Sequence, residues 1–461
     1  MHKVPTNSTT GYTKIYAPMN FTDDDFDFAE EDFNMKSFRH DETLGSVPDA
    51  VQEKELKDNF VRNCQKAAEA IRSADVLLLV TGAGFSADSG LAVYNDIANV
   101  PAYRERNLDY MGICMPDWLD SDPELFYGFW GQCFNDYRST NPHKGYDTIA
   151  RWKAEKNESD VAEEIRARIT KKETSRGTCK KEPVVQNSVY DVQDRPAGAF
   201  FSFTSNVDAH TYDVFEATEI HECHGNIEIW QCSSPSCDSG LWRIPMDHSF
   251  AVDTQTMLAA PTPKGQGEMT TSKPAEESTK QGNQESVAHV GQTKGSCARQ
   301  NTLQFMPPAK ENSTGLFETD WPRCGQCQGL ARPAVLMFGD FAWKSEQSQA
   351  HRWNLWKETV LDLCEQRRDA GVATRICILE VGCGMNVPTS RNISERILDQ
   401  VLGKGGEANL LRINPDHPFS NDIGISDYLI PIMSKGLDAI AKIDQYYKAA
   451  PTAKPTDRRN P

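Results

Sequence analysis

Five short runs of apolar residues, separated by stretches of helical character, restrict most strongly what this chain can fold into. The first run, Val76-Leu77-Leu78-Leu79-Val80, is apolar at every position, as a strand buried on both faces of a parallel sheet requires. Residues 142–153 and 393–402 instead place apolar side chains at helical spacing. Strands that alternate with helices predict an α/β fold built on a doubly wound parallel sheet. The other four runs cover residues 199–203, 334–338, 376–381 and 409–413.

Several segments do not suit a folded core, and the hydrophobic content of 38% lies below the roughly 45–50% of ordinary globular chains. Residues 1–55 alternate acidic with aromatic side chains and predict a disordered acidic tail, either a solvated leader or a partner-binding motif. Residues near 254–316 are rich in polar side chains and proline, which predicts a disordered insert. A charged stretch near 155–195 predicts a second insert, a helix followed by a loop, and residues 449–461 a second disordered tail.

Charge and composition exclude some classes of protein. No window approaches the ~18 consecutive apolar residues of a membrane-spanning helix, so no membrane association is expected. The formal net charge of −17, from 49 Lys+Arg against 66 Asp+Glu, argues against direct nucleic-acid binding. The N-terminus lacks the apolar core of a secretory signal, which predicts an intracellular protein. Cytoplasmic, nuclear and mitochondrial locations stay open, as does the oligomeric state.

Two close cysteine pairs, Cys232-x4-Cys237 and Cys324-x2-Cys327, carry the strongest chemical signal. Thiols of an intracellular chain stay reduced, so close pairs indicate metal ligands rather than disulfides. Four thiolates suit a closed, tetrahedral Zn²⁺ site that has no open position for catalysis. Residues 238–323 separate the two pairs, which is tolerable because the cost of loop closure grows slowly with length. The predicted division is a small zinc-ribbon domain, 229–332, inserted between the two parts of a larger domain, 56–228 and 333–448.

A glycine-rich turn follows the first apolar run. Gly82-Ala83-Gly84, with Ala87 at the third small position, fits the pattern G-x-G-x-x-[G/A], in which backbone N–H groups approach a pyrophosphate. The same turn also occurs as a purely structural connection after a buried strand. Because Ser86 and Ser89 add small polar side chains, we favour a Rossmann-like domain that binds a dinucleotide.

Polar residues follow the second apolar run. Asn206 and Asp208 come directly after residues 199–203, and open α/β sheets bind ligands at the carboxyl ends of their strands. An Asx turn that caps the next helix explains the same two residues equally well. His221 and His224 come next, and each is a structural residue, a metal ligand or a general base that works near neutral pH.

Taken in order, these motifs resemble the sirtuin family of NAD-dependent protein deacylases. The resemblance begins with Gly-Ala-Gly-Phe-Ser-x-x-Ser-Gly at Gly82, then Thr-Ser-Asn-Val-Asp at Thr204, then His224-Gly225 and the two cysteine pairs. It covers roughly residues 60–445 apart from the two inserts. The later matching segments are Phe338-Gly339-Asp340, similar to the family's Phe-Gly-Glu, Val381-Gly382-Cys383-Gly384 and Ile413-Asn414-Pro415-Asp416.

The resemblance implies a role for each matching residue. His224 matches the family's general base, and Asn206 and Asp208 match the pair that lines the nicotinamide and ribose pocket, so these three are the implied catalytic residues. The strand beside which an acyl-lysine peptide pairs by backbone addition is implied at Leu336, Met337, Phe338 and Gly339. The implied cofactor-binding residues are Gly82, Ala83, Gly84, Phe85, Ser86, Tyr94, Ser205, Asn206, Asp208, Gly382, Cys383 and Asn414.

The implied activity is the removal of acyl groups, acetyl above all, from acylated protein lysine. The reaction would consume NAD and yield nicotinamide and O-acyl-ADP-ribose, and the Zn²⁺ would be structural. Short apolar acyl groups are expected, because family members that remove acidic acyl groups carry Tyr-x-x-Arg on a helix where this chain has Trp130-Gly131-Gln132-Cys133.

Three departures from the family's pattern leave alternatives open. Asn95 stands where the family has a cofactor-contacting Arg, Ser205 where Gln is usual, and Cys383-Gly384 where Thr-Ser is usual. ADP-ribosyl transfer or NAD hydrolysis in the same pocket is one alternative. A non-catalytic NAD-binding scaffold, whose inserts recruit partners, is the other.

Overall fold

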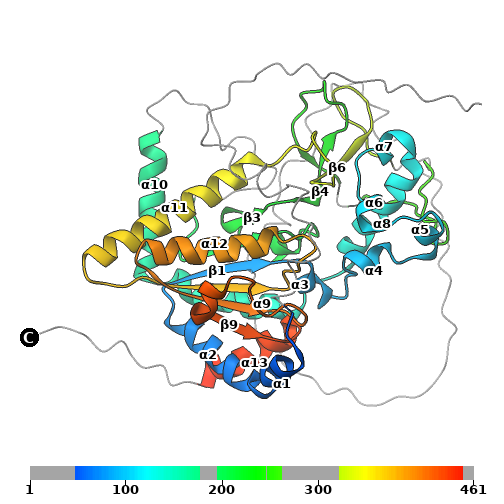
Figure 1. Ribbon diagram of the computed structural model, residues 1–461. Coiled ribbons are helices and arrows are strands. Elements are labelled where there is room, and N and C mark those ends of the chain that lie inside the picture. Colours follow the sequence, from blue (N-terminus) through cyan, green and yellow to red (C-terminus); the bar gives the residue numbers. More distant parts are fainter. Residues whose placement is uncertain (1–46, 177–194, 246, 262–320, 450–461) are drawn as a thin grey trace, which may run out of the picture. The chain divides into compact units, whose positions relative to one another are not determined.

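A six-stranded parallel sheet forms the centre of the structure (Figure 1). Its strand order is β3-β2-β1-β7-β8-β9, and every neighbouring pair is parallel. The order of the strands reverses between β1 and β7, which makes this the switch point where open α/β sheets bind ligands. The strands are β1 (Val76–Thr81), β2 (Phe200–Thr204), β3 (Ile220–Glu222), β7 (Arg375–Val381), β8 (Glu407–Ile413) and β9 (Leu429–Ile432).

The computed structural model describes residues 47–176, 195–245, 247–261 and 321–449, all of which belong to one compact unit. The acidic tail up to residue 46, the loop of the charged insert, most of the polar insert and the tail after residue 449 lie outside the described residues. Within the described ranges, no helix has both the length and the apolar character needed to cross a bilayer.

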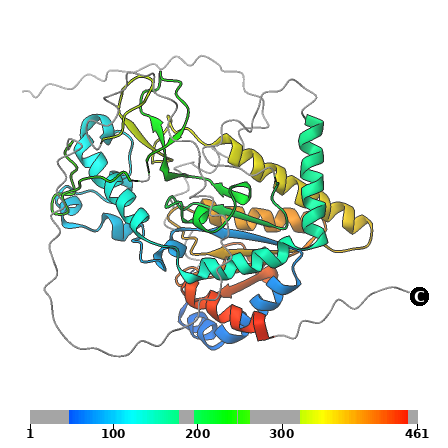
Figure 2. The ribbon, with the colours of Figure 1, turned by 180° about the vertical axis from the view of Figure 1, so that it is seen from behind.

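Helices cover both faces of the parallel sheet, as the alternation of strands and helices predicted (Figures 1 and 2). One face carries α2 (Phe60–Ser73), α9 (Lys144–Asn157) and α13 (Gly436–Ala449). The other carries α11 (Gln347–Asp369) and α12 (Thr389–Gly403), and α10 (Asp160–Arg176), the predicted helix of the charged insert, packs against α11. The doubly wound fold class is therefore confirmed. In α2 the side chains that face the sheet recur at helical spacing and are all buried: Cys64, Ala67, Ala68 and Ile71.

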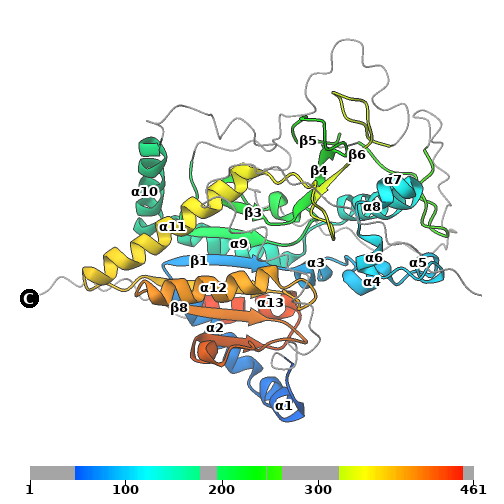
Figure 3. The ribbon, with the colours of Figure 1, turned by 45° about the horizontal axis from the view of Figure 1, so that its top comes forward.

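A second, antiparallel sheet of three strands has the order β5-β4-β6. It lies beside α8 (Pro123–Ser139) and shares a core with that helix (Figure 3). Aromatic rings join the two parts, since Tyr127 lies 4.8 Å from Trp321 and Phe134 lies 5.4 Å from Phe250 between ring centroids. The core of the small sheet thus includes α8, a helix that precedes β2 in the chain. Its strands are β4 (Gly225–Cys232), β5 (Trp242–Arg243) and β6 (Ala331–Val335).

Short helices, which were not predicted from the sequence, connect β1 to α8. Asp122 caps α8, because its side chain accepts a hydrogen bond from the Leu125 N–H and Pro123 occupies the first turn. The remaining helices are α1 (Ala50–Asp58), α3 (Ala83–Ala87), α4 (Tyr94–Ala98), α5 (Pro101–Glu105), α6 (Tyr110–Ile113) and α7 (Trp118–Ser121).

Three predicted boundaries are wrong. Residues 50–55, assigned to the acidic tail, form the first turns of α1, which the Asp49 side chain caps by accepting hydrogen bonds from Val51 N and Gln52 N. The run 334–338 is not a strand of the parallel sheet, because β6 ends at Val335 and pairs antiparallel with β4. The small sheet also extends beyond 229–332 at both ends, from Gly225 to Val335.

Within the range assigned to the disordered insert, residues 257–259 are packed in the structure. Met257 and Ala259 belong to the core shared by α8 and the small sheet, and the Ala259 N–H donates to the Glu124 carbonyl at 2.9 Å. A Cβ atom on Gly128 would lie 2.0 Å from the Met257 carbonyl oxygen, so this helix position must stay glycine. Core contacts therefore extend to Ala259, and a deletion that starts at 256 would remove them.

Leu79 lies in the central strand β1 and is 1% exposed. We expect Leu79→Ala to lower the free energy of unfolding by about 2–5 kcal/mol, because the lost methyl groups leave a cavity that the close-packed sheet cannot fill. Val61→Ala in α2 is the matched control, since Val61 is 45% exposed and should cost less than about 0.5 kcal/mol. Equilibrium urea unfolding measures both, and equal losses would contradict the burial of β1.

Candidate active site and cysteine cluster

The loops after β1 and β7 meet backbone to backbone at the switch point. The Gly84 N–H donates to the Gly382 carbonyl at 3.0 Å. Gly382 has φ +67°, and a Cβ atom there would lie 2.3 Å from Phe85 N. A Cβ on Gly82 would lie 2.8 Å from the Gly382 carbonyl oxygen. Only glycine allows this approach, so the structure brings the predicted segments 82–84 and 382–383 into direct contact.

Three amides of the glycine-rich turn already have protein acceptors. Gly82 N donates to Val381 O, Gly84 N to Gly382 O and Phe85 N to Gly82 O. In this conformation the glycines therefore serve the contact between the two loops, whichever ligand they also meet. The Phe85 side chain lies in the core, where its ring is 4.6 Å from that of His143 and 4.4 Å from that of Tyr146. Ala83 and Tyr94 begin the short helices α3 and α4.

Ser86 links the turn after β1 to the residues after β2. Its hydroxyl donates to Asp208 Oδ2 and accepts a hydrogen bond from Asn206 Nδ2 at 2.9 Å. Asp208 Oδ1 accepts from the His210 N–H at 2.9 Å, so both carboxylate oxygens have protein donors. Ser86, Asn206 and Asp208, predicted from two separate motifs, thus form one buried network.

Asn206 keeps one polar atom without a partner. Its N–H donates to Thr204 Oγ1 at 3.0 Å, and Ser205 N donates to Thr81 O at 3.1 Å, which fixes the backbone on both sides. The Asn206 Oδ1 atom is buried and accepts no hydrogen bond. A buried acceptor without a donor costs about 1–3 kcal/mol, so such an atom marks a place where a ligand donor fits.

His224 lies in the turn between β3 and β4, where the parallel sheet meets the small sheet. Burial lowers the pKa of His224 to about 4, although a hydrogen bond to the Ser205 backbone opposes this shift. The imidazole is therefore neutral, and able to accept a proton, at pH 7. Its neighbour Gly225 has φ +69°, and a Cβ there would lie 1.9 Å from the Ala334 carbonyl oxygen. This close approach holds the His224 turn against the small sheet.

The segment predicted to bind the peptide follows β6 and is attached to the same turn. Leu336 N donates to the His224 carbonyl at 2.9 Å, and Phe338 N donates to the Cys114 carbonyl at 3.1 Å. Met337 is fully buried, so its side chain is part of the core rather than of a peptide surface. Leu336 and Phe338 are half-buried, and Gly339, with φ +69°, is exposed.

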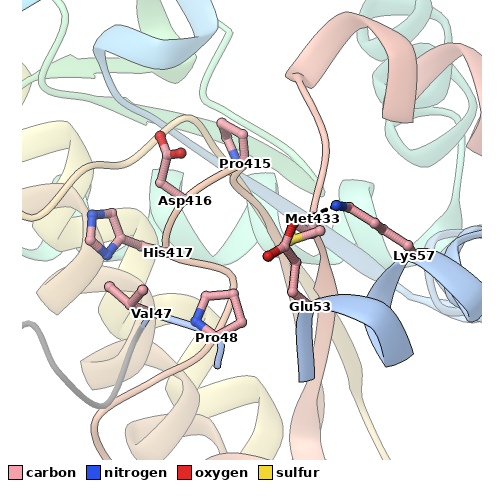
Figure 4. Close-up of a pocket in the computed structure, with 8 residues that line it drawn as sticks. All are labelled: Val47, Pro48, Glu53, Lys57, Pro415, Asp416, His417 and Met433. Carbon is pink, nitrogen blue, oxygen red and sulfur yellow. Dashed lines mark hydrogen bonds and ion pairs between the residues drawn. The ribbon is translucent and has the colours of Figure 1, made fainter. Parts of the chain in front are cut away.

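Asn414 uses its whole side chain to hold the loop after β8. Its Nδ2 donates to Cys383 O at 2.8 Å, while its Oδ1 accepts from Asp416 N and His417 N, both at 2.9 Å. Cys383 is buried, and burial raises the pKa of its thiol. This loop lines a groove of about 570 Å³ on the β8–β9 side of the sheet (Figure 4). The groove is lined by Val47, Pro48, Glu53, Lys57, Pro415, Asp416, His417 and Met433.

The four predicted cysteines converge at one end of the small sheet. Their Sγ atoms all lie within 4.8 Å of one another, with 3.4 Å between Cys232 and Cys327 and 3.8 Å between Cys237 and Cys324. A tetrahedron with Zn–S bonds of ~2.3 Å has S···S edges of about 3.8 Å, so the geometry fits a Zn²⁺ ion. Among the described residues, no other group of three or more metal-ligating side chains is comparably close, and His221 stacks on Trp353 instead.

No family model matches this sequence, and no curated protein matches it. Among solved structures, a Sir2 homologue in complex with NAD is 14% identical, with a TM-score of 0.41 over 83% of this chain and 94% of that one. A Sir2 His-to-Ala variant with a deacetylated p53 peptide and 3′-O-acetyl ADP-ribose is 12% identical (TM-score 0.38, 82% and 96% covered). Sir2Tm bound to a propionylated peptide is also 12% identical (TM-score 0.38, 82% and 95% covered).

Gly382→Ala should separate the two loops at the switch point. We expect it to lower the free energy of unfolding by at least about 2 kcal/mol, because alanine is strained at φ +67° and its Cβ would overlap Phe85 N. Gly384→Ala is the control, since a Cβ there meets no atom within 4 Å. Urea unfolding of both variants measures the difference, and equal stability would contradict the loop contact.

Cys324→Ser should abolish metal binding. We expect purified protein to contain about one Zn²⁺ per chain and this variant to contain none, with a lower unfolding temperature, because a structural site contributes its binding energy to folding. Cys223→Ser is the control, since Cys223 lies outside the cluster and should keep the metal. Elemental analysis by mass spectrometry gives the count. Protein without zinc, or the Cys324→Ser variant with full zinc, would contradict the assignment.

Proposed function

We propose that this protein removes acetyl and other short apolar acyl groups from protein lysine in a reaction that consumes NAD. The proposal rests first on the buried, unpartnered Asn206 Oδ1, which is next in the chain to Ser205, the residue whose backbone influences the pKa of the neutral His224 ring. This chemistry needs an acceptor for a hydrogen-bond donor of the cofactor and, next to it, a general base. The motif order from Gly82 to Asn414, which resembles the sirtuins, supports the same assignment.

The residues at the switch point fit a dinucleotide. Asn206 Oδ1 can accept a hydrogen bond from the carboxamide N–H of nicotinamide or from a ribose hydroxyl, which removes the cost of leaving it unpaired. Ser86 in α3 accepts a hydrogen bond from Asn206 and donates one to Asp208, which holds Asn206 in place from the turn after β1. NAD supplies an ADP-ribose acceptor for the acyl group and a nicotinamide leaving group. The glycines after β1 and β7 let the two loops approach each other at the switch point, where a dinucleotide would lie.

His224 is proposed as the general base. Because burial lowers its pKa to about 4, the ring is unprotonated at pH 7 and accepts a proton from a ribose hydroxyl, which can then attack the acyl carbon. The backbone carbonyl of His224 accepts a hydrogen bond from Leu336 N. This bond links the proposed base to the segment proposed to bind the peptide.

The substrate proposed is an acylated lysine in an extended peptide, next to Leu336, Phe338 and Gly339. At the positions where a Tyr-x-x-Arg motif would bind an acidic acyl group, Trp130 and Cys133 are buried in the core and Gln132 donates to Asp136. None of these side chains is a cation, and a buried acyl carboxylate would lack a charged partner there. Acetyl should therefore be preferred over succinyl.

His224→Ala should reduce the rate of deacetylation of an acetyl-lysine peptide by about 10²–10⁴-fold, the usual contribution of a general base. Release of nicotinamide should fall less, because the leaving group departs before the base acts. His221→Phe is the matched control, since His221 stacks on Trp353 and an aromatic ring preserves that contact. Steady-state assays of both products test this. Wild-type rates in the His224→Ala variant would refute the proposed role.

A further inference from the structure

Four charged side chains, three of them buried, form a cluster beneath the loop that follows β8. Arg412 in β8 donates to both oxygens of Glu380 in β7, at 2.7 and 2.8 Å, and the two residues are register partners. Arg412 Nη1 also donates to Glu395 in α12 at 2.8 Å. Arg391, one turn earlier in α12, completes the cluster at 3.9 Å from Glu380. Arg412, Glu380 and Arg391 are 0–3% exposed.

The two arginines hold the loop by its backbone. Arg391 Nη1 donates to His417 O at 3.0 Å, and its Nη2 donates to Phe419 O. Arg412 Nη1 reaches the same Phe419 carbonyl at 3.3 Å. The Ser420 hydroxyl donates to Glu395 at 2.8 Å, so the loop is tied to the cluster at three successive points.

The other end of this loop is fixed by Asn414, whose side chain bonds to Cys383 O and to the amides of Asp416 and His417. Between these two anchors the chain lines the groove of Figure 4. The conformation of residues 414–420 is therefore set by the charged cluster at one end and by the loop after β7 at the other.

Stability alone does not account for the cluster. Removing charged groups from water is costly, and apolar groups of the same volume often stabilise a protein as well or better. What an apolar group cannot do is donate hydrogen bonds to particular carbonyls. The guanidinium group of Arg391 offers several donors in a fixed plane, which lets one side chain hold two carbonyls two residues apart.

The position of the loop indicates which part of a cofactor it would meet. Asn206 and His224 lie at the ends of β2 and β3, on one side of the switch point, whereas residues 414–420 follow β8 on the other side. A dinucleotide lies across the carboxyl ends of the strands at such a point. With the nicotinamide half near Asn206, the adenosine half falls on the β7–β8 side.

We propose that the charged cluster of Arg391, Arg412, Glu380 and Glu395 sets the shape of residues 414–420 for the adenosine half of NAD, with Arg391 as the positioning residue. This inference rests on the proposed function. It concerns binding of the cofactor only and assigns no part of the chemical step to the cluster.

Arg391→Lys tests this by keeping the charge and removing the planar set of donors. We expect the Kd for NAD, measured by calorimetry on the full chain, to rise about tenfold, as the loss of a charge-assisted hydrogen bond predicts. The KM for NAD should rise in parallel, while the KM for the acetyl-lysine peptide stays at the wild-type value. A merely structural defect would not separate the two substrates in this way.

Arg138→Lys is the matched control. Arg138 is a second enclosed arginine that holds a carbonyl, that of Pro245 at 2.8 Å, but it lies in the small-sheet region. It should lower the unfolding temperature without changing the Kd for NAD. If Arg391→Lys does not fold, Ser420→Ala decides. It removes the bond between the loop and Glu395, together with the bond that the Ser420 hydroxyl accepts from Asp422 N, and should raise the Kd in the same direction by a smaller factor.

The outcomes separate the two levels of the proposal. If wild-type protein does not bind NAD, the proposed function fails and this inference fails with it. If wild-type protein binds NAD and the folded Arg391→Lys and Ser420→Ala variants bind it equally well, the inference is overturned and the proposed function stands. A rise in the KM for both NAD and peptide would also overturn it.

Discussion

The contact between the turn after β1 and the turn after β7 determines how the carboxyl edge of the sheet is organised. Gly82, Gly84 and Gly382 let the two backbones approach within hydrogen-bonding distance. This approach places α3 so that Ser86 reaches Asn206 and Asp208 across the end of β2. It also brings Ser390, at the start of α12, to the Thr81 carbonyl at 3.1 Å. Any side chain at Gly382 would disturb all of these contacts together.

The second organising feature is the junction between the two sheets. β3 ends at Glu222 and β4 begins at Gly225, so the two residues that join the sheets are Cys223 and His224. Leu336 leaves β6 at the same place and bonds to His224. A side chain at this junction has support from both sides, because Ser205 follows β2 of the parallel sheet and Gly225 begins β4 of the small sheet. The cysteine cluster braces the far end of the small sheet, and Lys344 Nζ donates to the carbonyls of Cys237 and Ser239.

Much of the fold could be predicted because buried parallel strands leave a clear pattern. The runs at 76–80, 199–203, 376–381 and 409–413 all lie in the parallel sheet, where each is mostly apolar and mostly buried. The run at 334–338 was wrongly assigned to the parallel sheet for the same reason. Residues of the small sheet pack against α8 on one face and against the core of the parallel sheet on the other. The cysteine cluster was predictable from spacing alone, since ligand type and pairing specify it.

The remaining features depend on contacts that one sequence does not reveal. Glu380 and Arg412 each interrupt an apolar run, and only the register of β7 on β8 shows that they pair. Asn414 was predicted to meet the cofactor, yet its side chain is used to shape a loop. Met257 and Ala259 sit in a polar stretch, and their burial depends on α8, more than a hundred residues earlier in the chain.

Product analysis is the decisive test of the proposed NAD-consuming deacylation at the switch point. The purified full chain would be incubated with NAD and an acetyl-lysine peptide, and the products identified by mass spectrometry. We predict nicotinamide, free lysine peptide and O-acetyl-ADP-ribose in equal amounts. Free ADP-ribose, or ADP-ribose attached to protein, with the acetyl group still on the peptide would contradict it. So would the absence of any product from protein that binds NAD.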